Sequence, residues 1–305
     1  MNIKREANPT MVTPYSEDGN VDYNAAKELC KMYINAGCQG IFASCQSSEI
    51  FFLTEDERVK LAKTVKDEVG DRLTVVASGH VSDDFESQVR ELNRICETGV
   101  DALILITNRM DIENTSDEKW ISDCEKLIAK LPEDMPLGLY ECPKPYKRLL
   151  TEKMLEWCKS TGRFRFIKDT CCDEAEIERR LRQLDGSGIM LFNANAQTLY
   201  RSLKAGAAGY CGVMANFHPE LYVKLMEKID TDDKAALEIA DFLSLAAFTE
   251  SLAYPVTAKY HLAHNLGLDV LTHTRCRSDS ELTDYHKMCI DQMHREAQRL
   301  SERID

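Results

Sequence analysis

The chain has 305 residues, 44% of them hydrophobic, which is enough for one large core or two small ones. A formal net charge of −13, without any stretch rich in Lys and Arg, makes nucleic acid an unfavourable partner. No apolar segment has the length that crossing a bilayer requires, and residues 1–14 contain no apolar run of the signal-peptide type. We therefore expect a soluble, cytoplasmic protein that binds neither nucleic acids nor membranes.

Eight short apolar segments alternate with charged segments of helical periodicity from the N-terminus to about residue 215. They lie at 9–14, 39–44, 73–79, 102–107, 136–141, 164–169, 189–194 and 208–213. Their near-continuous runs of Val, Ile and Leu are typical of strands that are buried on both faces, as in parallel sheets.

Capping patterns mark where helices begin between these strands. Thr54 and Glu57 have the spacing of a capping box, and Asp173 with Glu176 resembles the same arrangement. Further N-caps are expected at Ser82, Ser116 and Thr151. The sequence therefore predicts a helix after most of the strands.

Eight strands that alternate with helices predict an α/β fold, the (β/α)8 TIM barrel, over residues 1–217. An open, doubly wound sheet is the less favoured alternative, because no Gly-x-Gly-x-x-Gly pattern follows the first strand. Beyond the barrel, four segments read as helices, at 219–229, 232–250, 254–266 and 279–303. We expect residues 218–305 to form a C-terminal helical extension packed on the barrel.

Twelve cysteines raise the question of disulfides or a metal site. The chain is too long for a small disulfide scaffold, and it contains no Cys-x-x-Cys pair. His261 and His264 lie three residues apart on an expected helix, but no His-Glu-x-x-His pattern accompanies them. We therefore predict reduced, mostly buried thiols and no metal site.

The active site of such a barrel lies at the C-terminal ends of its strands, where Lys168 and Tyr140 end neighbouring apolar segments. Desolvation disfavours an ammonium group, and a neutral lysine amine is the form that attacks a carbonyl carbon. A phenol beside it could pass protons to and from the intermediate. The alternatives are a lysine that reaches solvent or pairs with Asp169, and a packed tyrosine with a hydrated hydroxyl.

The loop after the second apolar segment carries two adjacent serines, Ser47 and Ser48. Their hydroxyls and backbone N–H groups suit a substrate carboxylate. An ordinary loop of small polar residues is the alternative interpretation.

Several short motifs follow one another in a characteristic order. Tyr140-Glu141-Cys142-Pro143 has the form Tyr-x-x-Pro, and Phe166-Ile167-Lys168-Asp169 is similar to Gly-Ile-Lys-Glu/Asp. These motifs resemble those of the dihydrodipicolinate synthase and N-acetylneuraminate lyase family of pyruvate-handling barrels. The resemblance runs nearly end to end, through Met11–Pro14, Ser44–Glu49, the helix start Thr54–Arg58, Ala205–Gly209 with Ala215 and Asn216, and Tyr254–Val256.

The resemblance implies a role for each matching residue. Lys168 forms an imine with the substrate and Tyr140 relays protons. Ser47 and the Ser48 amide hold the carboxylate of pyruvate or another 2-oxo acid, and the carbonyl of Cys211 lines the pocket. The covalent imine on Lys168 replaces any metal or organic cofactor, and family members are usually homotetramers built as dimers of dimers.

The chain also departs from the family pattern. Gln46 stands where the family has a hydroxyl residue, and Arg109-Met110 stand where the synthases have a second relay tyrosine. Pro145 replaces the synthases' arginine for the second substrate, and Asn195-Ala196 replace the acidic pair of the sialic acid lyases. The shared imine chemistry is kept, whereas the residues that define both namesake substrates are missing.

The sequence therefore predicts a class I lyase or aldolase that acts on pyruvate or another 2-oxo acid plus an aldehyde. A dehydratase or hydratase-aldolase that uses the same imine is one alternative. A non-catalytic barrel that binds a 2-oxo acid is the other, because Gln46 and Met110 interrupt the expected proton relay. Arg109, with Lys144, Lys147 and Arg148, could hold an anionic aldehyde, or these cations could be solvated loop charges.

Overall fold

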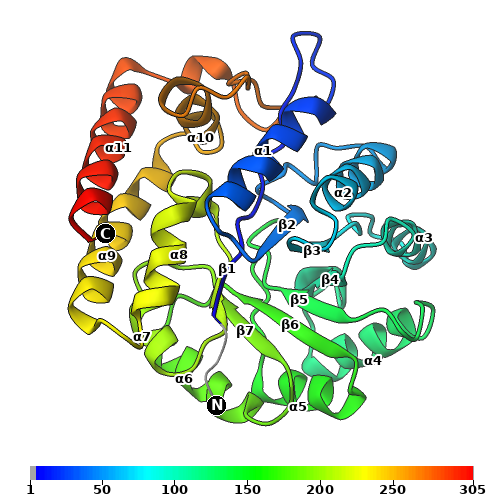
Figure 1. Cartoon of the computed structure of the whole chain (residues 1–305). Helices are drawn as coiled ribbons and strands as arrows, with labels where there is room; N and C mark the ends of the chain where they lie inside the picture. The colour runs from blue at the N-terminus through cyan, green and yellow to red at the C-terminus, as the bar shows by residue number, and fades with distance from the viewer. Residues whose placement is uncertain (1–4, 305) are drawn as a thin grey trace.

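The computed structural model describes residues 5–304, and its centre is a sheet of eight parallel strands (Figure 1). The strands are β1 (Glu6–Ala7), β2 (Gly40–Ser44), β3 (Thr74–Ala77), β4 (Ala102–Ile106), β5 (Leu137–Tyr140), β6 (Phe164–Asp169), β7 (Met190–Asn193) and β8 (Gly209–Tyr210). Each strand pairs with the next in the chain from β2 to β8, and β8 pairs with β1. A parallel bridge between Thr10 and Phe42 joins the two edges, so the predicted (β/α)8 barrel is confirmed.

Strands β2 to β7 lie within the apolar segments that predicted them, but β1 lies earlier than expected. Within residues 9–14, Thr10 forms a parallel bridge with Phe42 in the middle of β2, and Phe42 N–H donates to the Pro9 carbonyl at 2.9 Å. Gly209 explains how closely β1 approaches β8, because a Cβ at this position would lie 1.8 Å from the Glu6 carbonyl oxygen. Only glycine fits at this contact.

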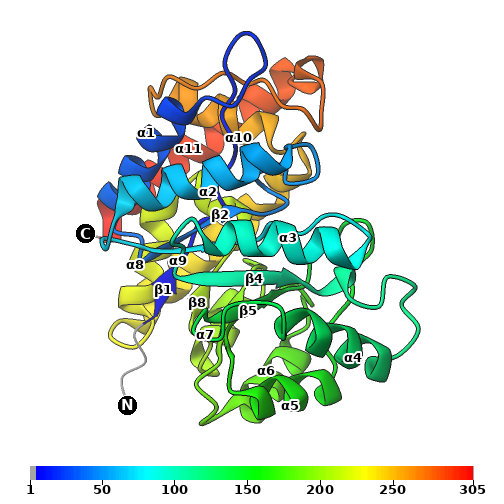
Figure 2. The ribbon, with the colours of Figure 1, turned by 90° about the vertical axis from the view of Figure 1, so that its right-hand side faces the viewer.

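Helices follow the strands and cover the outside of the barrel, and Figure 2 shows α2, α3 and α4 side by side on one flank. The helices up to β8 are α1 (Tyr23–Asn35), α2 (Glu55–Val69), α3 (Phe85–Cys96), α4 (Asp117–Ile128), α5 (Glu152–Thr161), α6 (Glu174–Leu184) and α7 (Leu199–Lys204). The capping box of Thr54 and Glu57 is confirmed. The cap predicted at Ser82 is wrong: Asp84 caps α3, and the Ser82 hydroxyl donates to Glu91 at 2.9 Å.

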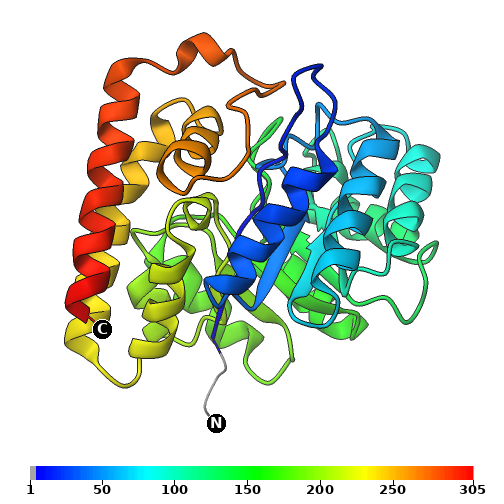
Figure 3. The same cartoon turned by 45° about the horizontal axis from the view of Figure 1, so that its top comes forward.

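The chain beyond β8 continues as helices only, within the part that the structure describes. Helix α8 (Pro219–Lys228) packs beside β1 and is followed by α9 (Asp233–Ala246). The chain continues through α10 (Val256–Tyr260), the π-helical turn His261–Asn265 and α11 (Asp284–Ile304). Figure 3 shows α11 running along the outer edge of the molecule, beside α9.

Two apolar layers hold the barrel together. A small cluster inside the barrel is rich in aromatic rings, among them Phe42, Phe166 and Phe192, and a larger layer lies between strands and helices. All twelve cysteines are free thiols, as the sequence predicted. No helix within residues 5–304 has the length and apolar character needed to cross a membrane.

Candidate active site

A cavity of about 970 Å³ opens at the C-terminal ends of the strands. Its wall includes residues that follow the seven strands β2 to β8 and residues from the C-terminal extension. They include Gln46, Ser47, Arg109, Tyr140, Lys144, Lys147, Lys168, Asn195, Gly212, Glu250, Tyr254 and Arg277.

Lys168 lies on β6 with its side chain facing this cavity, and only 3% of the residue is exposed. Its Nζ lies 4.3 Å from the centroid of the Tyr140 ring and 5.7 Å from that of the Phe42 ring. Within residues 5–304 the amine has no carboxylate within 4.0 Å. The lysine is therefore buried against aromatic rings, neither extended into solvent nor held by an acidic partner.

Asp169, the acid that could have paired with Lys168, faces the opposite side of the strand. Successive side chains of a strand alternate between its two faces. Arg180 of α6 donates from one nitrogen to Asp169 at 2.6 Å and to Glu141 at 2.7 Å, and all three side chains are at most 1% exposed. Arg180 therefore neutralises both acids beside the site, and neither acid pairs with Lys168.

Tyr140 lies directly opposite Lys168 in the pairing of β5 with β6. Burial, followed by the nearby Cys142 and Cys45, raises the pKa of the phenol well above its ordinary value. The phenol therefore remains protonated at neutral pH and can donate a proton to a group bound at Lys168.

Ser47 forms part of the cavity wall and belongs to a hydrogen-bond network that reaches into the C-terminal extension. Its hydroxyl donates to the Thr10 carbonyl at 2.9 Å and contacts the Tyr254 hydroxyl. Asn216 donates to the Tyr254 hydroxyl at 3.2 Å and accepts from Tyr33 at 2.6 Å. These contacts fix the orientation of the Ser47 and Tyr254 hydroxyls at the cavity wall.

Ser48 differs from its expected placement, because it lies inside the loop. Its N–H donates to the Cys45 carbonyl at 3.1 Å, and its hydroxyl donates to the Met11 carbonyl at 2.7 Å. The Ser47 N–H, in contrast, has no hydrogen-bond partner within residues 5–304. Of the two amides, therefore, only that of Ser47 is without a partner among these residues, and Ser48 holds the loop together.

The two departures that interrupt the expected relay lie in different places. The Gln46 side chain is at the cavity wall, where its oxygen accepts from the Cys142 thiol at 3.3 Å. Met110 is 2% exposed and belongs to the outer apolar layer, away from the cavity. Cys211 is also fully buried and lies beneath the wall, which Gly212 and Val213 form at this point.

The expected cation cluster is only partly at the cavity. Arg109 lines it, but its guanidinium donates to the Val81 carbonyl and to Asp83, both at 2.9 Å. Lys144 and Lys147 also line the cavity. Arg148 is not part of the wall, because it pairs with Asp111 at 3.4 Å and with Asp117 at 3.1 Å.

Comparison with known proteins agrees with this geometry. A sequence profile described as the dihydrodipicolinate synthetase family matches residues 5–286. The chain belongs to the dihydrodipicolinate synthetase family. The 4-hydroxy-tetrahydrodipicolinate synthase of Symbiobacterium thermophilum is 28% identical over 207 residues, which are 68% of each chain. The predicted family and its lyase and aldolase class are thus confirmed.

Two solved structures share the fold. The sialic acid aldolase of Ruminococcus gnavus superposes with a TM-score of 0.87 at 18% identity, covering 99% of this chain and 100% of its own. YagE, a prophage protein of this family from E. coli K12 in complex with pyruvate, gives 0.84 at 21% identity, covering 96% and 97%. These identities are low, so the two structures support the fold alone.

Two residues that lie far from the strands in the sequence reach the cavity in the folded chain. Tyr254 and Glu250 come from the C-terminal extension, yet both line the cavity near Lys168. Desolvation by the surrounding protein raises the pKa of Glu250, and the positive charges of Lys168 and Lys147 partly offset this rise. The Tyr254-Pro255 motif was visible in the sequence, but no local pattern indicates that its phenol reaches Ser47.

Proposed function

We propose that this protein is a class I lyase or aldolase that binds pyruvate or another 2-oxo acid as an imine on Lys168 and joins it to, or cleaves it from, an aldehyde. The observation that carries the proposal is the Lys168 amine, which is buried, lies against Tyr140 and opens onto the cavity. Borohydride reduction in the presence of pyruvate tests it, because reduction converts the imine into a stable secondary amine.

The reaction begins when the neutral Lys168 amine attacks the C2 carbonyl carbon. The resulting carbinolamine takes a proton from Tyr140 and loses water, which leaves a protonated imine. This imine withdraws electrons, so that C3 loses a proton to the Tyr140 phenolate, and the enamine carbon then attacks an aldehyde. The new alkoxide takes a proton from Tyr140. Water adds to the imine carbon and returns a proton to Tyr140, and the product is released as the amine is restored.

In this proposal the Ser47 N–H donates to the substrate carboxylate, and the Tyr254 hydroxyl turns from Ser47 to donate beside it. The Ser47 N–H and the two hydroxyls lie on the same part of the cavity wall, and their contacts with Thr10 and Asn216 fix their orientation. Preorganised donors of this kind convert binding energy into correct placement of the reacting carbon. Gln46 lies beside them and forms part of the same wall. Met110 offers no phenol, so the proton relay of this proposal depends on Tyr140.

We expect neither aspartate semialdehyde condensation with pyruvate nor N-acetylneuraminate cleavage to be the main activity. Pro145 and Asn195 both line the cavity, and Asn195 is engaged within its own loop, where its side-chain oxygen accepts from the Thr198 N–H at 3.0 Å. A missing charged partner costs about 1.5–3 kcal/mol for each hydrogen bond. Steady-state kinetics with the two compounds should give kcat/KM values well below that for the true substrate. Efficient turnover of either one contradicts this expectation.

We further propose a homotetramer, as the family resemblance implies. Leu245 and Phe248 give this proposal some support, because they lie three residues apart at the end of α9 and are 69% and 67% exposed. Apolar side chains exposed on one face favour association. Sedimentation velocity at micromolar concentration should show four chains per particle, whereas a monomer refutes the proposal.

A further inference from the structure

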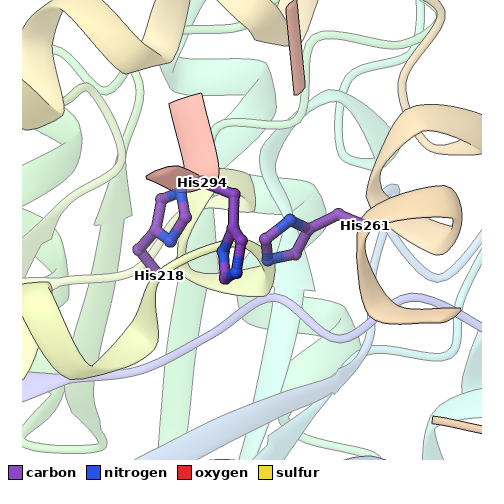
Figure 4. A group of neighbouring side chains, drawn as sticks. All are labelled: His218, His261 and His294. Carbon is purple, nitrogen blue, oxygen red and sulfur yellow. The ribbon is translucent and has the colours of Figure 1, made fainter. Parts of the chain in front are cut away.

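Three histidines from distant parts of the sequence meet in the C-terminal part of the fold. His218 precedes α8, His261 begins the π-helical turn after α10, and His294 lies on α11. Figure 4 shows the three rings gathered around one point. One nitrogen from each ring can be chosen so that all three lie within 4.8 Å of one another. None of the three residues lines the cavity of Lys168.

The hydrogen bonding of two of these rings, His218 and His294, leaves a nitrogen without a partner. The Nε2 atom of His218 and the Nδ1 atom of His294 are buried, and neither has a hydrogen-bond partner within residues 5–304. Buried polar atoms without a partner are rare in folded proteins and call for an explanation. A bound ion that accepts both lone pairs provides one.

His261 differs from the other two rings, because both of its nitrogens lie at hydrogen-bond distance from an oxygen, and one of these contacts must give way when an ion binds. Its Nε2 lies 2.8 Å from the Phe217 carbonyl oxygen and its Nδ1 lies 3.1 Å from Oδ1 of Asn265. A neutral imidazole carries one N–H and can donate to only one of these oxygens. Burial, and then the neighbouring His218, hold the pKa of both His261 and His294 below its ordinary value. Neutral rings are the form that binds metal ions.

Carboxylates stand behind two of the rings, as they do around many metal-bound histidines. Nδ1 of His218 lies 3.8 Å from the carboxylate of Glu220, which leaves Nε2 to face the other rings. Asp291 accepts from Asn265 at 3.1 Å, and Asn265 in turn contacts Nδ1 of His261. These contacts orient the rings from outside the cluster.

We propose that His218, His261 and His294 bind a divalent transition-metal ion of the zinc type. Three imidazole nitrogens about 2.0–2.1 Å from the ion, with a water in the fourth position, form an ordinary zinc site, and imidazole is a preferred ligand of zinc and its neighbours. His218 and His261 are 2% and 0% exposed, whereas His294 is only half-buried, so an ion and its water can enter beside α11. The ion fastens α11 to α8 and to the turn after α10.

Zinc itself is the probe for this site. Chelator-treated wild-type protein should bind about one Zn²⁺ per chain in calorimetric titration, and saturating zinc should raise Tm by roughly 3–6 °C. Cobalt in place of zinc should give the visible absorption of a four-coordinate ion. The substitution His294→Gln should weaken zinc binding by at least roughly 100-fold and remove the cobalt spectrum. Because His294 is half-buried, this variant should remain folded, which circular dichroism can verify.

The matched control is His264→Gln. His264 belongs to the same turn as His261, but it is exposed and stacks on Tyr260. All twelve cysteines remain in both variants, so zinc held by thiols affects the two equally. We expect His264→Gln to bind zinc as the wild type does. Equal zinc affinity of His294→Gln and wild type, or a wild type that binds no zinc, overturns the proposal.

Discussion

Incubation with pyruvate and borohydride is expected to leave a covalent adduct on Lys168, with the mass of pyruvate less one water plus two hydrogens. Lys168 is 3% exposed and lines the cavity, and its amine has no acidic partner within residues 5–304. Digestion and mass spectrometry should therefore find the label on this lysine. Lys168→Ala should take up no label and lose turnover by a factor on the order of 10⁴ or more, because no other residue replaces the nucleophile.

Lys259 is an internal control for this experiment. It is also buried, and burial lowers the pKa of its amine to about 8. If labelling followed amine basicity alone, Lys259 would also be labelled. Its Nζ instead donates to the His273 carbonyl at 2.5 Å and lies 3.3 Å from Glu49, and it does not line the cavity. We expect it to stay unmodified.

The rate of labelling separates the roles around Lys168. Tyr140→Phe should still label, but more slowly, since a positioned acid–base group contributes roughly 10²–10⁴-fold. Should pyruvate and other 2-oxo acids all leave Lys168 unmodified, the imine mechanism fails. Labelling without turnover of any aldehyde would instead favour the non-catalytic binding barrel.

Replacing Arg180 by Met is expected to destabilise the fold by about 3–5 kcal/mol, because it leaves a buried charge without its partner. Glu141 and Asp169 are both fully buried, and Arg180 is the only cation within 4.0 Å of either among residues 5–304. Urea unfolding measures the loss of stability. Arg182→Met on the same helix is the control, since Arg182 is 71% exposed in its side chain and pairs with Glu178 only at 3.7 Å. The control should cost less than about 0.5 kcal/mol.

The effect of Arg180→Met should depend on pH in a defined direction. Burial, and then Asp169, raise the pKa of Glu141 to about 7 even with Arg180 present. When folding raises the pKa of a carboxyl, the protein loses stability as the pH rises from the pKa of that group in the unfolded chain to its pKa in the folded chain. Without Arg180 this cost grows, so the deficit of the variant should be larger at pH 8 than at pH 5. An equal deficit at both values contradicts this account of Arg180 and its two acids.

The sequence by itself determined the barrel and placed Lys168 and Tyr140 together at the C-terminal ends of its strands. A strand that is buried on both faces of a parallel sheet needs an almost continuous apolar run, such as 102–107. Strands β2 to β7 were therefore predictable from local composition. Lys168 and Tyr140 end two such runs, and strand ends of a barrel converge on one face. The short strands were less predictable, because β1 and β8 depend on the close contact at Gly209.

Only the tertiary structure decided which polar groups face the cavity and which are engaged in hydrogen bonds inside the protein. The Ser47 and Ser48 amides look equivalent in sequence, but the turn around Cys45 uses one and leaves the other at the cavity. Asp169 follows Lys168 in the sequence and could have paired with it. In the folded chain it points to the opposite face of β6 and pairs with Arg180. Tyr254 and the three histidines join segments far apart in the chain. Such contacts arise from how helices pack, and no local pattern of residues encodes them.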